Sequence, residues 1–201
     1  MNATASPIAP SIVAFWAALS IAASLLRRFV GFPNDMWLPL LFLASLIAPL
    51  ATFLLAYLMS PGYRDRVQHV GLRSAIFVQT WRLGGVIFLV LHAFGHLSGM
   101  FALPAGLGDM AIGATAPAIA ALVSSQSRFA RGAFLAWNIF GILDMMAAVG
   151  LGFLASRSAL AAHVTTFPMT TFPLMLIPTF LVPLFLIYHI VCLTHIKAVV
   201  S

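Results

Sequence analysis

Long apolar runs separated by short polar turns make up most of the sequence, and this pattern limits the folds open to it. A helix needs about 20 apolar residues to cross the hydrocarbon core of a bilayer. About six runs meet this criterion, and they cover residues 8–26, 36–59, 74–98, 105–123, 131–155 and 172–196. Only 7% of the residues are charged, against roughly 25% in soluble domains. The sequence therefore predicts an all-α integral membrane protein, a single domain over residues 1–201 that forms one bundle of about six transmembrane helices.

The basic residues indicate an orientation in the membrane. They lie in ones and twos at the ends of the apolar runs, which is not the pattern of a nucleic-acid-binding protein despite the net charge of +6. Basic residues are enriched in cytoplasmic loops. With six spans, both termini share a side with Arg64, Arg66, Arg73, Arg128, Arg131 and Lys197, whereas Arg27, Arg28 and Arg157 fall on the other. We expect a multi-pass protein of a bacterial inner membrane with cytoplasmic termini, although the Arg27-Arg28 pair beside the first run favours the opposite orientation.

The third apolar run carries an unusual number of polar side chains for a membrane segment. Gln79, Arg82, His92 and His96 fall on one face when the run is projected at about 100° per residue. Polar side chains within a bilayer turn toward the bundle interior or a wet cavity. We therefore expect this face to point into the bundle.

An ion pair between Arg82 and Asp144 of the fifth run is the simplest way to keep Arg82 in the membrane. An unpaired charge near the middle of a bilayer costs a few kcal/mol or more. Gln79 and Asn138 are then expected to form interhelical hydrogen bonds, with Asn138 or His189 joining the pair. Such a buried polar network is compatible with any function.

A cofactor site is the more specific hypothesis. His92 and His96 are four residues apart, so on a helix they lie one above the other, and Asp109 adds a carboxylate across a short hairpin. Two histidines and one carboxylate suit iron or zinc with open coordination positions. Haem is the related alternative, with axial ligands among His92, His96 and His189, although His92 and His189 lie about ten residues of helix rise apart. This set predicts a metal ion or haem used for redox or metal-handling work.

Transport is the competing class of function, because His, Asp and Arg at successive depths are what a proton relay or a small-solute path requires. A substrate-binding or assembly subunit of a larger complex, or a homo-oligomer, is the third class. Ala14, Ala18 and Ala22 form a stripe of small residues that suits packing against another helix, within this chain or in a partner. The sequence lacks Gly-x-Ser-x-Gly, Walker-type and His-Glu-x-x-His motifs, so it decides neither for nor against an enzyme.

Three segments resemble an uncharacterised family of bacterial multi-pass membrane proteins. They are Leu-Pro-Ala-Gly-Leu-Gly-Asp at 103–109, Trp-Asn-Ile-Phe-Gly-Ile-Leu-Asp at 137–144, and the last run with its prolines 173, 178 and 183. The resemblance covers roughly the later two-thirds of the chain. It implies no particular activity.

Overall fold

The computed structural model describes residues 8–30, 37–125, 127–157 and 166–199, and these ranges contain helices and turns but no strand. The helices are α1 (Ile8–Val30), α2 (Trp37–Met59), α3 (Pro61–Gln68), α4 (Leu72–Val78), the 3-10 helix η1 (Gln79–Gly85), α5 (Val86–Ala93), α6 (Gly99–Ser124), α7 (Ala130–Arg157), the 3-10 helix η3 (Phe167–Thr170), the π-helix η4 (Ile177–Leu181) and α8 (Val182–Thr194).

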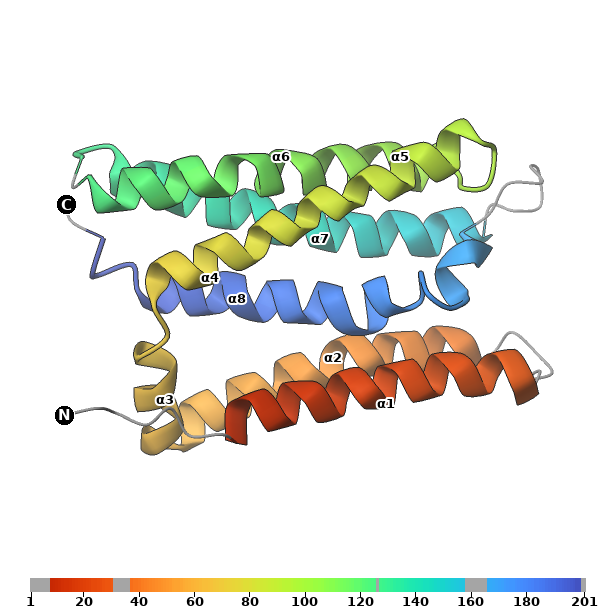
Figure 1. Ribbon diagram of the computed structural model, residues 1–201, viewed down its shortest axis with the longest axis horizontal. Coiled ribbons are helices and arrows are strands. Elements are labelled where there is room, and N and C mark those ends of the chain that lie inside the picture. The colour runs from red at the N-terminus through yellow and green to blue at the C-terminus, as the bar shows by residue number, and fades with distance from the viewer. Residues whose placement is uncertain (1–7, 31–36, 126, 158–165, 200–201) are drawn as a thin grey trace.

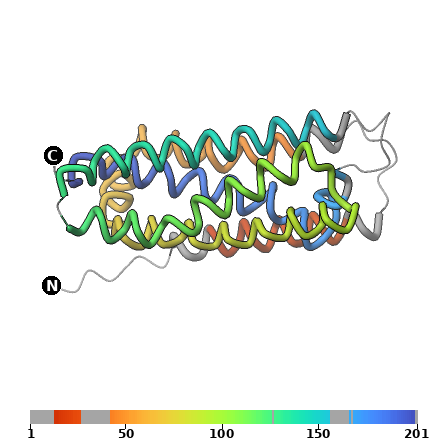
Figure 2. The backbone as a smooth tube through the Cα atoms, turned by 90° about the horizontal axis from the view of Figure 1, so that it is seen from above, coloured from red at the N-terminus to blue at the C-terminus, as the bar shows by residue number. Residues whose placement is uncertain are grey.

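Successive long helices run in opposite directions along a common axis (Figure 1). The segments α4, η1 and α5 follow one another as a single rod, which we call the third rod because it comes after α1 and α2. It packs against α6, and α6 packs in turn against α7. The last helix, α8, contacts α4, α7 and α2, and thereby joins the α2 layer to the rest of the bundle. Seen from above, the rods stay close to parallel over the length of the molecule (Figure 2).

Five helical stretches are long and apolar enough to cross a membrane, namely Phe42–Met59, Leu72–Ala93, Gly99–Ser124, Ala130–Ala155 and Ile177–Thr194. They correspond to five of the runs that the sequence predicted. The first run differs: within α1, the described side chains form an apolar stretch over Val13–Leu26, which is shorter than the roughly 20 residues that a bilayer requires. Over the described residues, the fold is thus all-helical with five candidate membrane spans, where the sequence predicted about six.

The small-residue stripe of α1 does not form a seam within the described part of the chain. Ala14, Ala18 and Ala22 are exposed. The helix packs instead against η4, where the ring of Trp16 meets that of Phe180 edge-on at 4.8 Å.

The hairpin between the third and fourth predicted runs is placed differently from the prediction. The third rod ends at Ala93, and α6 begins at Gly99, six residues before the expected start at 105. Gly95 has a φ of +72°, a conformation that glycine adopts readily and that ends helices. The Gly95 amide donates to the His92 carbonyl and the His96 amide to the Leu91 carbonyl, at 2.9 and 2.8 Å. This pair of bonds is a Schellman motif, so His96 lies beyond the helix.

Candidate functional site

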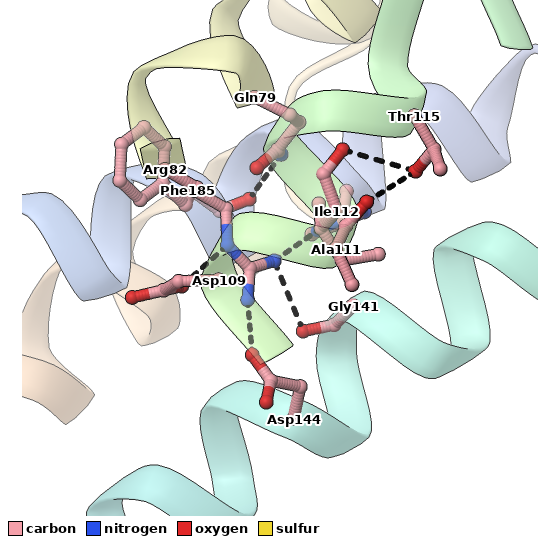
Figure 3. A network of polar contacts seen from close by, with 10 residues as sticks. Gln79, Arg82, Asp109, Ala111, Ile112, Thr115, Gly141, Asp144 and Phe185 are labelled. Atoms are coloured by element: carbon pink, nitrogen blue, oxygen red, sulfur yellow. Dashed lines mark hydrogen bonds and ion pairs between the residues drawn. The ribbon is translucent and has the colours of Figure 1, made fainter. Parts of the chain in front are cut away.

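Arg82 lies near the middle of the third rod, and its side chain is completely buried. Its Nε donates to Asp109 Oδ1 on α6 at 2.7 Å, and its Nη2 donates to Asp144 Oδ2 on α7 (Figure 3). The Asp144 pair is the one expected from the sequence. Asp109, which the sequence assigned to a metal site, is instead the second partner of Arg82. One guanidinium therefore joins three rods of the bundle.

The remaining nitrogen of Arg82 reaches α8. Nη1 lies 3.2 Å from His189 Nε2 and 3.4 Å from the Gly141 carbonyl. On the other side of the ring, His189 Nδ1 lies 3.0 Å from Asn138 Oδ1. The Asn138 amide nitrogen donates to the Phe134 carbonyl at 2.8 Å, which leaves Oδ1 as the acceptor for His189.

These bonds assign the tautomer of His189. Its Nδ1 carries the hydrogen that Asn138 accepts, and its Nε2 accepts from Arg82, so the imidazole is neutral. Both ring nitrogens are engaged. His189, which the sequence offered as a haem ligand, has no nitrogen free for an iron while this arrangement holds.

Two further polar side chains lie around this group. Gln79, one turn before Arg82, donates to the Phe185 carbonyl of α8 at 3.0 Å, while its Oε1 has no partner among the described residues. Trp137 packs its ring against His189 with centroids 5.2 Å apart and donates to Thr115 Oγ1 at 3.0 Å. All of the predicted network residues, Gln79, Arg82, Asn138 and Asp144, thus line one buried region, which we call the Arg82 cluster together with Asp109 and His189.

Glycines make room for the polar side chains of the Arg82 cluster. A Cβ at Gly85 of η1 would lie 2.5 Å from the Cβ of Asp109, and one at Gly108 of α6 would overlap the Asp144 carboxylate. A Cβ at Gly141 of α7 would overlap the His189 ring. The sequence indicates close backbone approach at Gly108, beside Asp109, but the sequence interpretation missed Gly85 and Gly141, although Gly141 lies in the same motif as Asp144.

The proposed metal set does not come together. His92 is half-buried, with Nδ1 3.0 Å from the Leu97 carbonyl and its ring over Gly99, whereas His96 is exposed after the Schellman turn. Asp109 forms an ion pair with Arg82 instead. Among the residues that the structure describes, no group of three or more His, Cys, Asp or Glu side chains is placed to hold a metal ion. The helix end at Ala93 separates His92 from His96, because four-residue spacing aligns two side chains only within a helix.

Replacing Asn138 by Ala should destabilise the protein by about 1–3 kcal/mol, because the Nδ1 hydrogen of His189 would lose its acceptor in a buried site. Unfolding in a detergent titration would measure this loss. Thr80→Ala, which removes only an exposed side-chain bond to the Phe77 carbonyl of the same rod, is the control and should cost less. An Asn138→Ala variant as stable as the parent would contradict the tautomer assignment.

A family model described as a domain of unknown function (DUF8737) matches residues 38–196. The chain belongs to this family. The DUF8737 match includes every residue of the Arg82 cluster and begins after α1. The resemblance to an uncharacterised family is confirmed in this form, since the description of DUF8737 names no activity. No curated protein and no solved structure matches the chain.

Proposed function

We propose that this DUF8737 protein is a proton-coupled membrane transporter that carries its proton on Asp109 or Asp144 beside Arg82. Its main support is the charge balance of the Arg82 cluster. Arg82 contributes +1 and the two carboxylates −2, so the cluster has a net charge of −1 when both are ionised and His189 is neutral. An uncompensated charge among apolar helices is costly. Protonation of either Asp109 or Asp144 would bring the net charge of the cluster to zero.

Proton exchange at this site would alter contacts between rods. With one carboxylate protonated, Arg82 keeps a single full ion pair, to either α6 or α7, and the cluster is neutral. With both ionised, the guanidinium is held equally by both helices. Asp109 and Asp144 side chains are 18% and 9% exposed, whereas Arg82 is fully buried, so the carboxylates are the part that a proton can reach. Loading and release would thus bias the position of the third rod.

The rod that carries Arg82 has a feature suited to such movement. Its middle, η1, is a 3-10 helix of seven residues, whereas 3-10 segments rarely exceed three or four and mark hinges when they interrupt a helix. Conversion to α-helix would shorten the segment by roughly 3.5 Å and rotate one end against the other by roughly 140°. Gly84 faces open space, so side-chain packing at that position does not oppose the change. Two conformations of one element are what alternating access requires.

The cofactor hypothesis has less geometric support. His92, His96 and Asp109 are not assembled, and both nitrogens of His189 are engaged. Iron, zinc or haem binding through these residues stays a prediction from the sequence.

For the orientation in the membrane, we propose that one end of the bundle, where α3 lies and α8 terminates, faces the cytoplasm. Most of the exposed basic side chains lie at that end.

A pH step across a layer of proteoliposomes should displace charge transiently, because a proton that enters a site between spanning helices moves charge even when no solute is present. The Asp109→Asn/Asp144→Asn double variant should lose nearly all of this displacement. His96→Ala, an exposed residue outside the Arg82 cluster, is the control and should keep it. An infrared difference spectrum over the same step should show one protonated carboxyl that both single Asn variants lack. Equal displacement in the double variant and the parent, or none in the parent, would exclude the proposal.

A further inference from the structure

One end of the bundle is strongly basic. It comprises α3, the start of α4, the turn from α6 to α7 and the end of α8, which Figure 1 shows together on the left. We call it the basic end. Its exposed cations are Arg64, Arg66, Arg73, Arg128, Arg131 and Lys197, and its exposed acid is Asp65. Six positive charges and one negative charge leave +5 at this end.

The short helix α3 lies across the axis of the long helices (Figure 1), so it would be parallel to the surface of a membrane that those helices cross. Its inner face belongs to the core, where Val67 is buried and the ring of Tyr63 meets that of Phe53 edge-on at 6.1 Å. Its outer face carries Arg64 and Arg66. A helix with one packed apolar face and one basic face, located where spanning helices end, is typical of the headgroup region.

Two arginines of the basic end are held in place by the protein. Arg64 donates through Nε to the Tyr57 carbonyl at 3.3 Å and through Nη2 to the Leu58 carbonyl at 3.0 Å, at the end of α2. Arg73 donates through Nε to Ser124 Oγ at 2.6 Å, which links α4 to the end of α6. A guanidinium has five donor hydrogens, so each keeps others for a ligand. Because the side chains are already ordered, a ligand loses little affinity to ordering them.

We propose that the basic end binds the headgroups of anionic phospholipids such as phosphatidylglycerol. Phosphate oxygens accept charge-assisted hydrogen bonds from guanidinium groups. Each basic residue beside an anionic leaflet strengthens the attraction roughly fivefold, so several together decide between anionic and neutral lipids. The acyl chains would lie along the apolar surfaces of the spanning helices. This binding does not depend on the Arg82 cluster.

Native mass spectrometry of the full chain in a neutral detergent would test the proposal, with phosphatidylglycerol and phosphatidylcholine of identical acyl chains as ligands. Phosphatidylglycerol should bind at least about tenfold more tightly at low salt, and the preference should fall as salt rises. The triple variant Arg64→Gln/Arg66→Gln/Arg128→Gln should lose most of the preference. Arg157→Gln, at the opposite end in α7, is the matched control and should change it by less than about twofold.

Equal binding of the two lipids by the parent would overturn the proposal, as would a triple variant that is folded and keeps the full preference. Thermal unfolding of each variant in detergent alone distinguishes lost binding from lost folding. Inorganic phosphate at the same concentration supplies the third comparison. If it displaces the lipid completely, the site takes a free anion and not a phospholipid.

Discussion

Arg82→Gln should be the most destabilising single charge replacement in this protein. Glutamine has no positive charge, so Asp109 and Asp144 would remain between the helices without a counterion. Removal of one side of a buried ion pair typically costs about 3–5 kcal/mol, because the other side stays buried and unpaired. His189 Nε2 would also lose the donor that it now has in Arg82. Together these losses are comparable to the whole stability of many domains.

The triple variant Arg82→Gln/Asp109→Asn/Asp144→Asn should be more stable than Arg82→Gln alone, because neutral amides replace the stranded charges. Unfolding of the parent, Arg82→Gln and the triple variant in a detergent titration would show this strong non-additivity. Arg128→Gln, in the exposed turn before α7, is the control and should change stability by less than about 1 kcal/mol. If the triple variant were less stable than Arg82→Gln, the cluster would not be held by charge.

The Arg82–Asp144 pair could be anticipated because the sequence offers few charges among its apolar runs, and the cost of an unpaired one is large. Asp109 was missed as a partner for a geometric reason. An expected helix start at 105 places Asp109 only about 6 Å along its helix, near the membrane surface. Because α6 starts at Gly99, ten residues earlier in the chain than Asp109, the carboxylate lies about 15 Å along the helix. This depth brings it level with Arg82.

The histidine pair shows how a single residue overrides a spacing rule. His92 and His96 align only if the helix continues, and Gly95 ends it through its positive φ. Glycine after an apolar run is a recognised helix-stop signal, so the sequence contained the information. The 3-10 winding of η1 is different. No spacing in Gln79–Gly85 predicts it, and the structure shows only that this segment packs closely against α6.

Gly141→Ala should destabilise the protein by at least about 2 kcal/mol, from overpacking and from lost hydrogen bonds in the Arg82 cluster. The added methyl group would overlap the His189 ring and lie 3.2 Å from Arg82 Nη1, so the imidazole must move away from Arg82 and Asn138. Gly150→Ala is the matched control in the same helix, because a Cβ there meets no atom within 4 Å. It should change stability by no more than about 1 kcal/mol, with the better helix propensity of alanine favouring it.

The reason for the Gly141→Ala effect can be tested with His189→Ala, which empties the space that the new methyl group needs. Once the ring is gone, adding Gly141→Ala should cost little more, so the double variant should be about as stable as His189→Ala alone. Detergent unfolding of these variants, with Gly150→Ala beside them, completes the cycle. Full additivity of the two losses would mean that Gly141 is required for some contact other than His189. Equal tolerance of alanine at 141 and 150 would contradict the close packing of α8 on α7, on which the hydrogen bond between Arg82 and His189 depends.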